Sequence, residues 1–212
     1  MRVLAATIAL AAAPAFHAWS APVPVWAQKE IRASNHIHKG CPVQFPQLRL
    51  LRVTYWGFDH KVHTGQIVVN ENATAALTTV FHKLYDIRFP IRYMSVIQAY
   101  GPAKDIPKND DVTQSFSCRD AVPSPCSSGT STGHWSMHAY GDAVDLNPLE
   151  NPYVGCGQTR DKVAVSYMNR ARVRPGMVTP QIYSIFASVG WGWGGSWVGS
   201  TKDYMHFSTN GH

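Results

Sequence analysis

Hydrophobic and polar side chains alternate in several short stretches of this chain. Over residues 50–56 they follow the two-residue period of a strand with one buried face. The same pattern predicts a second short strand over residues 66–69 and a third, central strand over residues 92–99. Short strands of this kind, combined with few helical stretches, are typical of an α+β domain.

Two stretches have the helical period instead. Within residues 73–86, apolar side chains recur every three or four positions and predict a buried helical stripe. A second helix is expected over residues 180–189, where Thr179 can cap the helix and Pro180 fits its first position. Residues 101–132 form a long, turn-rich segment, and segments of this length without regular structure tend to be functional.

The N-terminal region has the pattern of a separate unit. Arg2 precedes an apolar run over residues 3–13, and small-x-small triplets end at Ser20 and Ala27. We expect a secretory signal peptide over residues 1–27, cleaved after Ser20 or Ala27. The apolar run is shorter than the roughly 20 residues that span a bilayer. An uncleaved anchor is the alternative.

The rest of the chain is predicted to be one globular domain. Residues 28–49 are polar and, toward their end, contain prolines, and we expect them to be extended. We assign residues 28–40 to an N-terminal arm and residues 41–212 to the domain. A chain of 212 residues with 45% hydrophobic and 15% charged side chains can build a hydrophobic core that needs no cross-links for its stability. No second stretch is long enough to span a membrane, so the cleaved protein should not stay inserted in one.

The charge of the chain is mildly basic, with a formal value of +6. Such a charge is either ordinary surface or an attraction to an anionic cell wall. The sequence has no run of lysines and arginines and no basic patch interleaved with aromatic residues, which argues against nucleic-acid binding.

The candidate metal-binding and catalytic residues lie in two segments. The string S-M-H-A-Y-G-D-A-V-D supplies His138 and Asp145, and K-D-Y-M-H-F supplies Asp203 and His206. Two histidines and one carboxylate make a three-ligand shell for a single zinc ion and leave the fourth position open for water. An open position is typical of a catalytic zinc site, because structural sites usually have four protein ligands.

The spacing of these residues constrains the geometry. His138 and Asp145 lie an odd number of positions apart, so they cannot share one face of a regular strand. Gly141 between them permits the bend that brings both to one point. A short strand over residues 143–146 would carry Asp145. Asp203 would lie at a turn before the last strand, where a carboxylate can act as the general base.

The two segments also carry a family resemblance. The first fits the SxHxxGxAxD signature of zinc D-alanyl-D-alanine peptidases, and the second resembles their (D/E)xxHF element. The chain resembles the branch that contains D-alanyl-D-alanine carboxypeptidases and phage-type L-alanyl-D-glutamate endopeptidases. The resemblance implies that His138, Asp145 and His206 bind zinc and that Asp203 is the catalytic base. Many relatives have glutamate at the position of Asp203.

The resemblance extends over about residues 41–207 and includes the strings N-P-x-x-N-P-Y-V and G-W-G-W-G-G-S-W. It implies a hedgehog/DD-peptidase-like α+β fold, in which a small antiparallel sheet carries the zinc site and a few helices flank it.

The family resemblance and the local sequence suggest roles for five further residues. Arg119 lies in a segment resembling a (T/S)xxFxCR element, and the resemblance implies that it stabilises the oxyanion. A guanidinium suits that task because it stays charged and offers several donors. Asp111 would orient this arginine or bind substrate, and Ser136 would hydrogen-bond near the metal histidines. His63 has either a structural role or a role in the substrate cleft, and Trp193 lines the cleft or belongs to the core.

The four cysteines also point to export. Cys41, Cys118, Cys126 and Cys156 show no CxxC spacing, and an oxidising compartment favours disulfides. Four cysteines allow three pairings. The resembling family often has cysteines at the positions of Cys41 and Cys118, which implies Cys41–Cys118 and leaves Cys126–Cys156. The local pair Cys118–Cys126 is the alternative.

These observations predict a zinc metallopeptidase that hydrolyses peptide bonds in peptidoglycan stem peptides. It would be a carboxypeptidase or an endopeptidase, secreted to the periplasm or the cell wall and monomeric. Substrate carboxylates could bind Arg92, Arg119 or the arginines of residues 160–174.

The sequence leaves two non-catalytic alternatives. One is a catalytically silent, zinc-containing module of the same fold that binds the cell wall. The other is a purely structural zinc ion with His134 as a fourth ligand, which Gly133 and the family pattern oppose.

Overall fold

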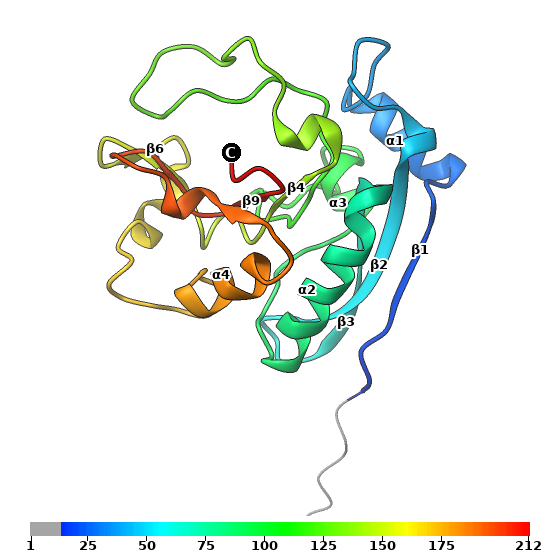
Figure 1. Ribbon diagram of the computed structural model, residues 1–212, viewed down its shortest axis with the longest axis horizontal. Helices are drawn as coiled ribbons and strands as arrows, with labels where there is room; N and C mark the ends of the chain where they lie inside the picture. The colour runs from blue at the N-terminus through cyan, green and yellow to red at the C-terminus, as the bar shows by residue number, and fades with distance from the viewer. Residues whose placement is uncertain (1–13) are drawn as a thin grey trace, which may run out of the picture.

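The computed structural model describes residues 14–212 and has the predicted α+β architecture (Figure 1). It contains three small antiparallel sheets with strand orders β1-β2-β3, β4-β9-β7 and β6-β5-β8. The apolar run predicted to be the core of a signal peptide lies outside the described residues.

The strands are β1 (Ala18–Pro22), β2 (Leu48–Trp56), β3 (Val62–Asn70), β4 (Ala143–Asp145), β5 (Tyr153–Gly155), β6 (Gln158–Thr159), β7 (Gly192–Trp193), β8 (Lys202–Asp203) and β9 (His206–Ser208). The α-helices are α1 (Val25–Ala33), α2 (Thr74–Asp86), α3 (Val96–Tyr100) and α4 (Pro180–Ala187). Short 3-10 turns are η1 (Phe45–Gln47), η2 (Glu71–Ala73), η3 (Met137–Tyr140), η4 (Lys162–Tyr167) and η5 (Gly194–Ser196).

The first sheet and α2 form one side of the core. Strands β2 and β3 pair over their whole length, and α2 lies across them (Figure 1). The helix buries the predicted stripe, whose members are Leu77, Val80, Phe81 and Leu84. Burying a large apolar side chain contributes roughly 1.5–3 kcal/mol relative to exposing it, so this stripe is enough to fix the helix on the sheet. The predicted helix over residues 73–86 and the strand over residues 50–56 are therefore confirmed.

The second sheet, β4-β9-β7, packs one face on this core and carries two of the candidate metal ligands. In it, Asp145 of β4 pairs with His206 of β9, and the next pair is Val144 with Phe207. Phe207 is fully buried and stacks on Phe186 of α4, with ring centroids 3.6 Å apart. Apolar side chains thus hold both strands from behind, while their polar neighbours face the opposite side.

The prediction of a central strand over residues 92–99 is wrong. Ser95 instead caps the short helix α3, because its side chain accepts a hydrogen bond from the Gln98 backbone. Tyr93 keeps only an isolated bridge to Val112. A serine that satisfies an amide at a helix start competes with strand pairing, and here it prevails over the alternating pattern.

The expected extended arm is also wrong in part. Residues 28–33 belong to α1, which buries Ala27 and Ile31 at helical spacing in a second core cluster. Strand β1 pairs with β2 from Ala18 to Pro22. The two cleavage positions predicted for a signal peptide therefore fall inside β1 and α1.

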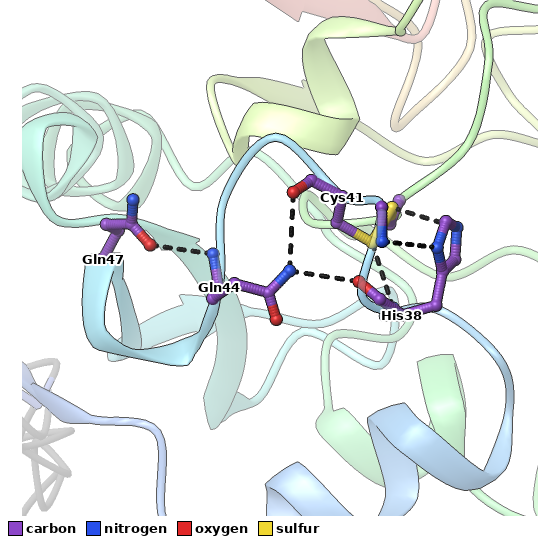
Figure 2. The surroundings of a disulfide bond; sticks show 6 residues. His38, Cys41, Gln44 and Gln47 are labelled. Atoms are coloured by element: carbon purple, nitrogen blue, oxygen red, sulfur yellow. Dashed lines mark hydrogen bonds between the residues drawn. A yellow bond between two sulfur atoms is a disulfide. The ribbon is translucent and has the colours of Figure 1, made fainter.

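The chain forms two disulfides, Cys41–Cys118 and Cys126–Cys156. These are the pairs implied by the family resemblance, and the local alternative Cys118–Cys126 is wrong. Around the first one, the His38 amide donates to the Cys41 sulfur at 3.0 Å, and a His38 ring nitrogen lies 3.4 Å from the Cys118 sulfur (Figure 2). The bond anchors the residue next to Arg119.

Within residues 14–212, no helix has the length and apolar character needed to cross a membrane.

Candidate metal centre

Three buried side chains from separate segments converge on one point. His138 Nε2 lies 3.2 Å from Asp145 Oδ1 and 3.2 Å from His206 Nδ1, and the third side of this triangle measures 3.3 Å. Ligands that bind a tetrahedral zinc ion at about 2.0–2.1 Å lie about 3.3 Å from one another. The triangle therefore has the dimensions of a zinc site.

Local structure explains how the segments reach this arrangement. His138 lies on η3, whose first amides are capped by the Ser136 side chain. The chain then reverses at Gly141, which has a φ of 72°. A Cβ atom there would lie 2.6 Å from the Asn70 backbone nitrogen, so only glycine fits. The bend predicted at Gly141 brings Asp145 back toward His138.

The protonation of the centre favours a cation. A hydrogen bond of 2.6 Å from His138 Nδ1 to the Ser115 carbonyl leaves the Nε2 lone pair directed at the centre. Burial lowers the pKa of His138. Burial opposes the charge on Asp145, yet the charges and hydrogen bonds of His138 and His206 outweigh it and hold the pKa of Asp145 well below its usual range. Burial opposes a charge on His206, yet its hydrogen bond to Asp145 and the charge of Asp145 outweigh this and raise the pKa of His206. The centre thus contains one carboxylate, with the lone pair of His138 beside it.

Asp203 lies next to the centre but is not part of the triangle. Its Oδ1 atom is shielded from solvent and has no hydrogen-bond partner among the described residues. Burial, followed by the charge of Asp145, raises the pKa of Asp203 to about 7. A carboxylate that has one oxygen without a partner and a pKa near neutral is well suited to accept and return a proton.

Two hollows meet at the centre, with volumes of about 340 Å³ and about 180 Å³. They share the lining residues Arg119, Val122, Asp145, Tyr153 and Met205. The larger hollow continues toward the segments that carry Asp110, Gln114, Pro148, Arg160 and Asp161. The smaller one contains Ser136, His138, Trp197, Asp203, His206 and His212. A substrate could thus extend to both sides of the metal triangle.

Arg119 lies where the sequence predicts a cationic group. It lines both hollows, and within the described residues its guanidinium makes one hydrogen bond, of 3.2 Å, to the Asp120 carbonyl. Its other donors remain available to a ligand. Ser136 also lies at the centre, although it bonds the His138 backbone rather than either imidazole ring.

The other candidate residues lie elsewhere. His63 is exposed on β3 and pairs with Asp59 at 2.9 Å, outside both hollows. Asp111 is fully buried and bonds Arg92 at 2.7 Å, so it orients Arg92 and not Arg119.

Trp193 is partly buried and packs against the core on Phe207, outside both hollows. His134 stays on the exposed loop, outside the metal triangle.

Several residues of the site were missed by sequence reasoning. The Ser115 carbonyl, Tyr153 and Met205 have no motif spacing of their own to identify them. Tyr153 lies inside the string N-P-Y-V, so the only available signal was its family resemblance.

A second group of potential ligands consists of His38, Cys41 and Cys118. Because its two sulfurs form a disulfide, they cannot act as thiolate ligands.

Comparison with known proteins agrees with this centre. Residues 129–209 match the family described as D-alanyl-D-alanine carboxypeptidase. The resemblance is therefore confirmed over residues 129–209. The match to these carboxypeptidases includes all four residues His138, Asp145, Asp203 and His206, whereas Arg119 lies outside it. No match was found among curated proteins or among solved structures.

Proposed function

We propose that the protein is a zinc-dependent peptidase that hydrolyses peptide bonds in peptidoglycan stem peptides, as a carboxypeptidase or an endopeptidase. The observation that carries the proposal is the triangle of His138, Asp145 and His206 with Asp203 unpartnered beside it. The family match supports the class of reaction and substrate.

The three triangle residues would hold one zinc ion, because their donor atoms and spacing fit it. Zinc supplies Lewis-acid chemistry, which polarises a carbonyl and lowers the pKa of water to about 7. The Ser115 carbonyl fixes the tautomer of His138, as the second partner of a metal histidine commonly does.

The remaining steps belong to side chains of the chain itself. Asp203 accepts a proton from the attacking water and later passes it to the leaving amine. Its pKa of about 7 suits both transfers at neutral pH. Arg119 donates hydrogen bonds to the negative charge that develops on the carbonyl oxygen. No covalent intermediate with the protein is needed.

The arginines differ in their availability to substrate carboxylates. Arg92 is bonded to two carboxylates, and Arg170 bonds the Glu150 and Val178 carbonyls and the Asn151 side chain. Arg119 and Arg160 line the larger hollow. One Arg160 nitrogen already donates to the carbonyls of Pro123, Ser124, Ser127 and Gly129, whereas Arg119 makes a single hydrogen bond, so we assign the substrate contact to Arg119.

The enzyme is proposed to act outside the cytoplasm. Two disulfides support this, because disulfides persist in oxidising compartments and are rare in the cytosol. A catalytically silent wall-binding module is the weaker hypothesis, since such a module would have no use for an unpartnered Asp203 that titrates near neutral pH.

The test is digestion of purified peptidoglycan and soluble muropeptides, with products identified by mass. Reactions would contain chelator, chelator followed by zinc, or no addition. We expect hydrolysis that chelator stops and zinc restores. A folded, zinc-loaded protein that releases no product would contradict the peptidase and favour the binding module.

A further inference from the structure

The segment of residues 115–119 lies alongside the metal motif and bonds it at every second position. The Ser115 carbonyl accepts a hydrogen bond from the His138 ring at 2.6 Å, and the Ser117 amide donates to the His138 carbonyl at 3.0 Å. The Arg119 carbonyl accepts from the Ser136 amide at 3.1 Å, and the Arg119 side chain lines both hollows. This segment therefore places one metal ligand and the proposed oxyanion group at the same time.

The first half of the segment is held by the core. Phe116 is fully buried, and its amide donates to the Val68 carbonyl at 3.0 Å. Its carbonyl accepts a hydrogen bond from the Tyr100 hydroxyl at 2.6 Å. The neighbouring Ser115 carbonyl, which orients His138, is thus fixed by contacts that involve no cysteine.

The second half of the segment is held by a disulfide. The Cys118 amide donates to the His36 carbonyl at 3.1 Å, and its sulfur is bonded to Cys41, 77 positions away. Beyond Arg119 the chain runs into a loop whose residues 126–135 are exposed. The disulfide is the covalent anchor next to Arg119, at the point where the segment leaves the core.

Cys41 offers a firm point of attachment for this anchor. It belongs to the second core cluster, together with Ile37. The His38 amide donates to the Cys41 sulfur at 3.0 Å, and the Cys41 amide donates to the His38 carbonyl at 3.1 Å. The Gln44 side chain donates to the same carbonyl at 3.0 Å (Figure 2). Because this turn is closed around one sulfur, the disulfide transmits its position to Cys118.

The second disulfide differs in every one of these respects. Cys126 and Cys156 are both exposed, and their bond joins the exposed loop to the turn between β5 and β6. Neither cysteine is among the residues that line the two hollows. The chain therefore contains a matched control for the first disulfide.

We propose that the Cys41–Cys118 disulfide positions Arg119, so that full activity requires this bond to be oxidised. The inference rests on the proposed function, in which Arg119 stabilises the oxyanion. Such a donor acts only at hydrogen-bond distance, and a displacement of about 1 Å can cost roughly 100-fold in rate. The metal triangle does not depend on the bond, because Phe116 holds Ser115 in place without it.

A thiol reductant opens the bond in two exchange steps. Its thiolate attacks one cysteine sulfur, the S–S bond breaks, and the other cysteine leaves as a thiolate that takes up a proton. A second molecule of the reductant then displaces the first one. The products are two cysteine thiols and the disulfide of the reductant, so two electrons pass to the protein. Activity would thereby be limited to the oxidising compartments in which disulfides persist.

The first experiment compares two double variants, Cys41→Ser/Cys118→Ser and Cys126→Ser/Cys156→Ser, as zinc-loaded proteins acting on one soluble muropeptide. Below the melting temperature of each protein, we expect kcat to fall about 100-fold in the first and to stay close to wild type in the second. The zinc content of both should equal that of the wild type. A disulfide that only stabilises the fold would lower the melting temperature and leave kcat unchanged.

A double-mutant cycle shows whether the disulfide acts through Arg119. Arg119→Ala is made in the wild type and in the Cys41→Ser/Cys118→Ser protein. If the bond serves to place the guanidinium, the replacement of Arg119 lowers kcat strongly in the wild type and little in the protein without the bond.

Binding gives a readout that needs no turnover. A phosphinate peptide carries a tetrahedral, negatively charged centre in place of the scissile carbonyl. Calorimetry should show that Cys41→Ser/Cys118→Ser binds this peptide more weakly than the wild type does, while the affinity for the product peptide is unchanged.

A redox titration covers the case in which Cys41→Ser/Cys118→Ser does not fold. In the Cys126→Ser/Cys156→Ser protein, Cys41–Cys118 is the bond that remains to be reduced. The protein is equilibrated with mixtures of reduced and oxidised glutathione, free thiols are counted by alkylation and mass, and zinc content is measured in each mixture. We expect kcat to fall as the bond is reduced and to return on reoxidation, at constant zinc content.

The outcomes separate the two proposals. Full kcat without the bond, equal losses in the two double variants, or losses that add in the cycle would overturn the positioning role while the peptidase stands. If the oxidised, zinc-loaded wild type hydrolyses no substrate, the proposed function fails and the inference fails with it.

Discussion

The protein contains two buried clusters of charged groups, and they differ in how their charges are compensated. In the first cluster, Arg92 binds Asp111 and Glu150 at 2.7 Å each, and both carboxylates are fully inaccessible to solvent. The chain itself provides the cation. In the second cluster, around Asp145, the described chain provides imidazoles at 3.2–3.3 Å but no arginine or lysine partner.

The Arg92 cluster acts as a frame. Asp111 accepts a hydrogen bond from the Leu149 amide, and the Arg92 amide donates to the Asn147 side chain. It thereby ties together two segments, residues 110–114 and residues 147–152, which both contribute to the wall of the larger hollow. Its guanidinium is engaged by both carboxylates, although Glu150 Oε2 is buried without a hydrogen-bond partner among the described residues.

In the metal centre, the described chain places no arginine or lysine beside the carboxylate. The Asp203 oxygen and one nitrogen of His206 are buried without partners among the described residues. Leaving such groups unsatisfied costs about 1–3 kcal/mol each. Glu150 Oε2 in the Arg92 cluster is also buried without a partner in the described chain, so the two clusters differ in whether that chain provides a cation and not in whether every polar atom is satisfied.

The largest expected effect comes from Asp203→Asn, which keeps the shape of the side chain and removes its capacity to carry a proton. Loss of a general base lowers the rate by roughly 10²–10⁴-fold. We expect kcat to fall by this factor while zinc content and thermal stability stay close to wild type. A variant that retains full kcat would exclude Asp203 as the proton carrier.

The next effect in size concerns the frame. Arg92→Ala leaves two buried carboxylates without their cation, and breaking a buried pair typically costs about 3–5 kcal/mol. We expect a lower free energy of unfolding in urea, with zinc binding retained as long as the protein is folded. His63→Ala is the matched control, because it removes an exposed contact with Asp59 that solvent screens. Equal losses in the two variants would refute the distinction between frame and surface.

The smallest effect is a dependence of stability on pH. Burial, followed by the charge of Glu150, raises the pKa of Asp111 from 3.8 to about 7. The folded state therefore holds this proton more tightly than the unfolded chain. Its contribution to stability is complete below the unfolded pKa and is lost as the pH rises to about 7.

Asp111→Asn has no such proton to lose. Between about pH 5 and about pH 7, we expect the unfolding free energy of the wild type to fall relative to that of this variant. Urea unfolding across this range measures the difference. Parallel curves for the two proteins would show that Asp111 does not share a proton within the Arg92 cluster.

The sequence was informative where the signal is local. His138, Gly141 and Asp145 lie within one short string, so their convergence at a bend could be predicted, and the period of residues 73–86 identified α2. The strand predicted over residues 92–99 failed because the capping contact of Ser95 outweighs an alternating pattern over so few positions.

Contacts between residues far apart in the chain could not be predicted from the sequence either. Arg92 meets partners 19 and 58 positions away, and no spacing rule connects them. The sequence therefore left Arg92 among the candidates for substrate binding, although its donors are occupied. The position of Trp197 likewise depends on contacts with Tyr153 and His212, from other parts of the chain.

The most direct test of the difference between the two clusters is the zinc content of the metal-reconstituted protein. Wild type, His206→Ala and Glu150→Gln would be compared by calorimetric titration and by elemental analysis after dialysis. We predict one zinc ion per chain in the wild type and in Glu150→Gln, and a loss of tight binding in His206→Ala. Full zinc retention by His206→Ala, or no binding by the wild type, would contradict the metal centre.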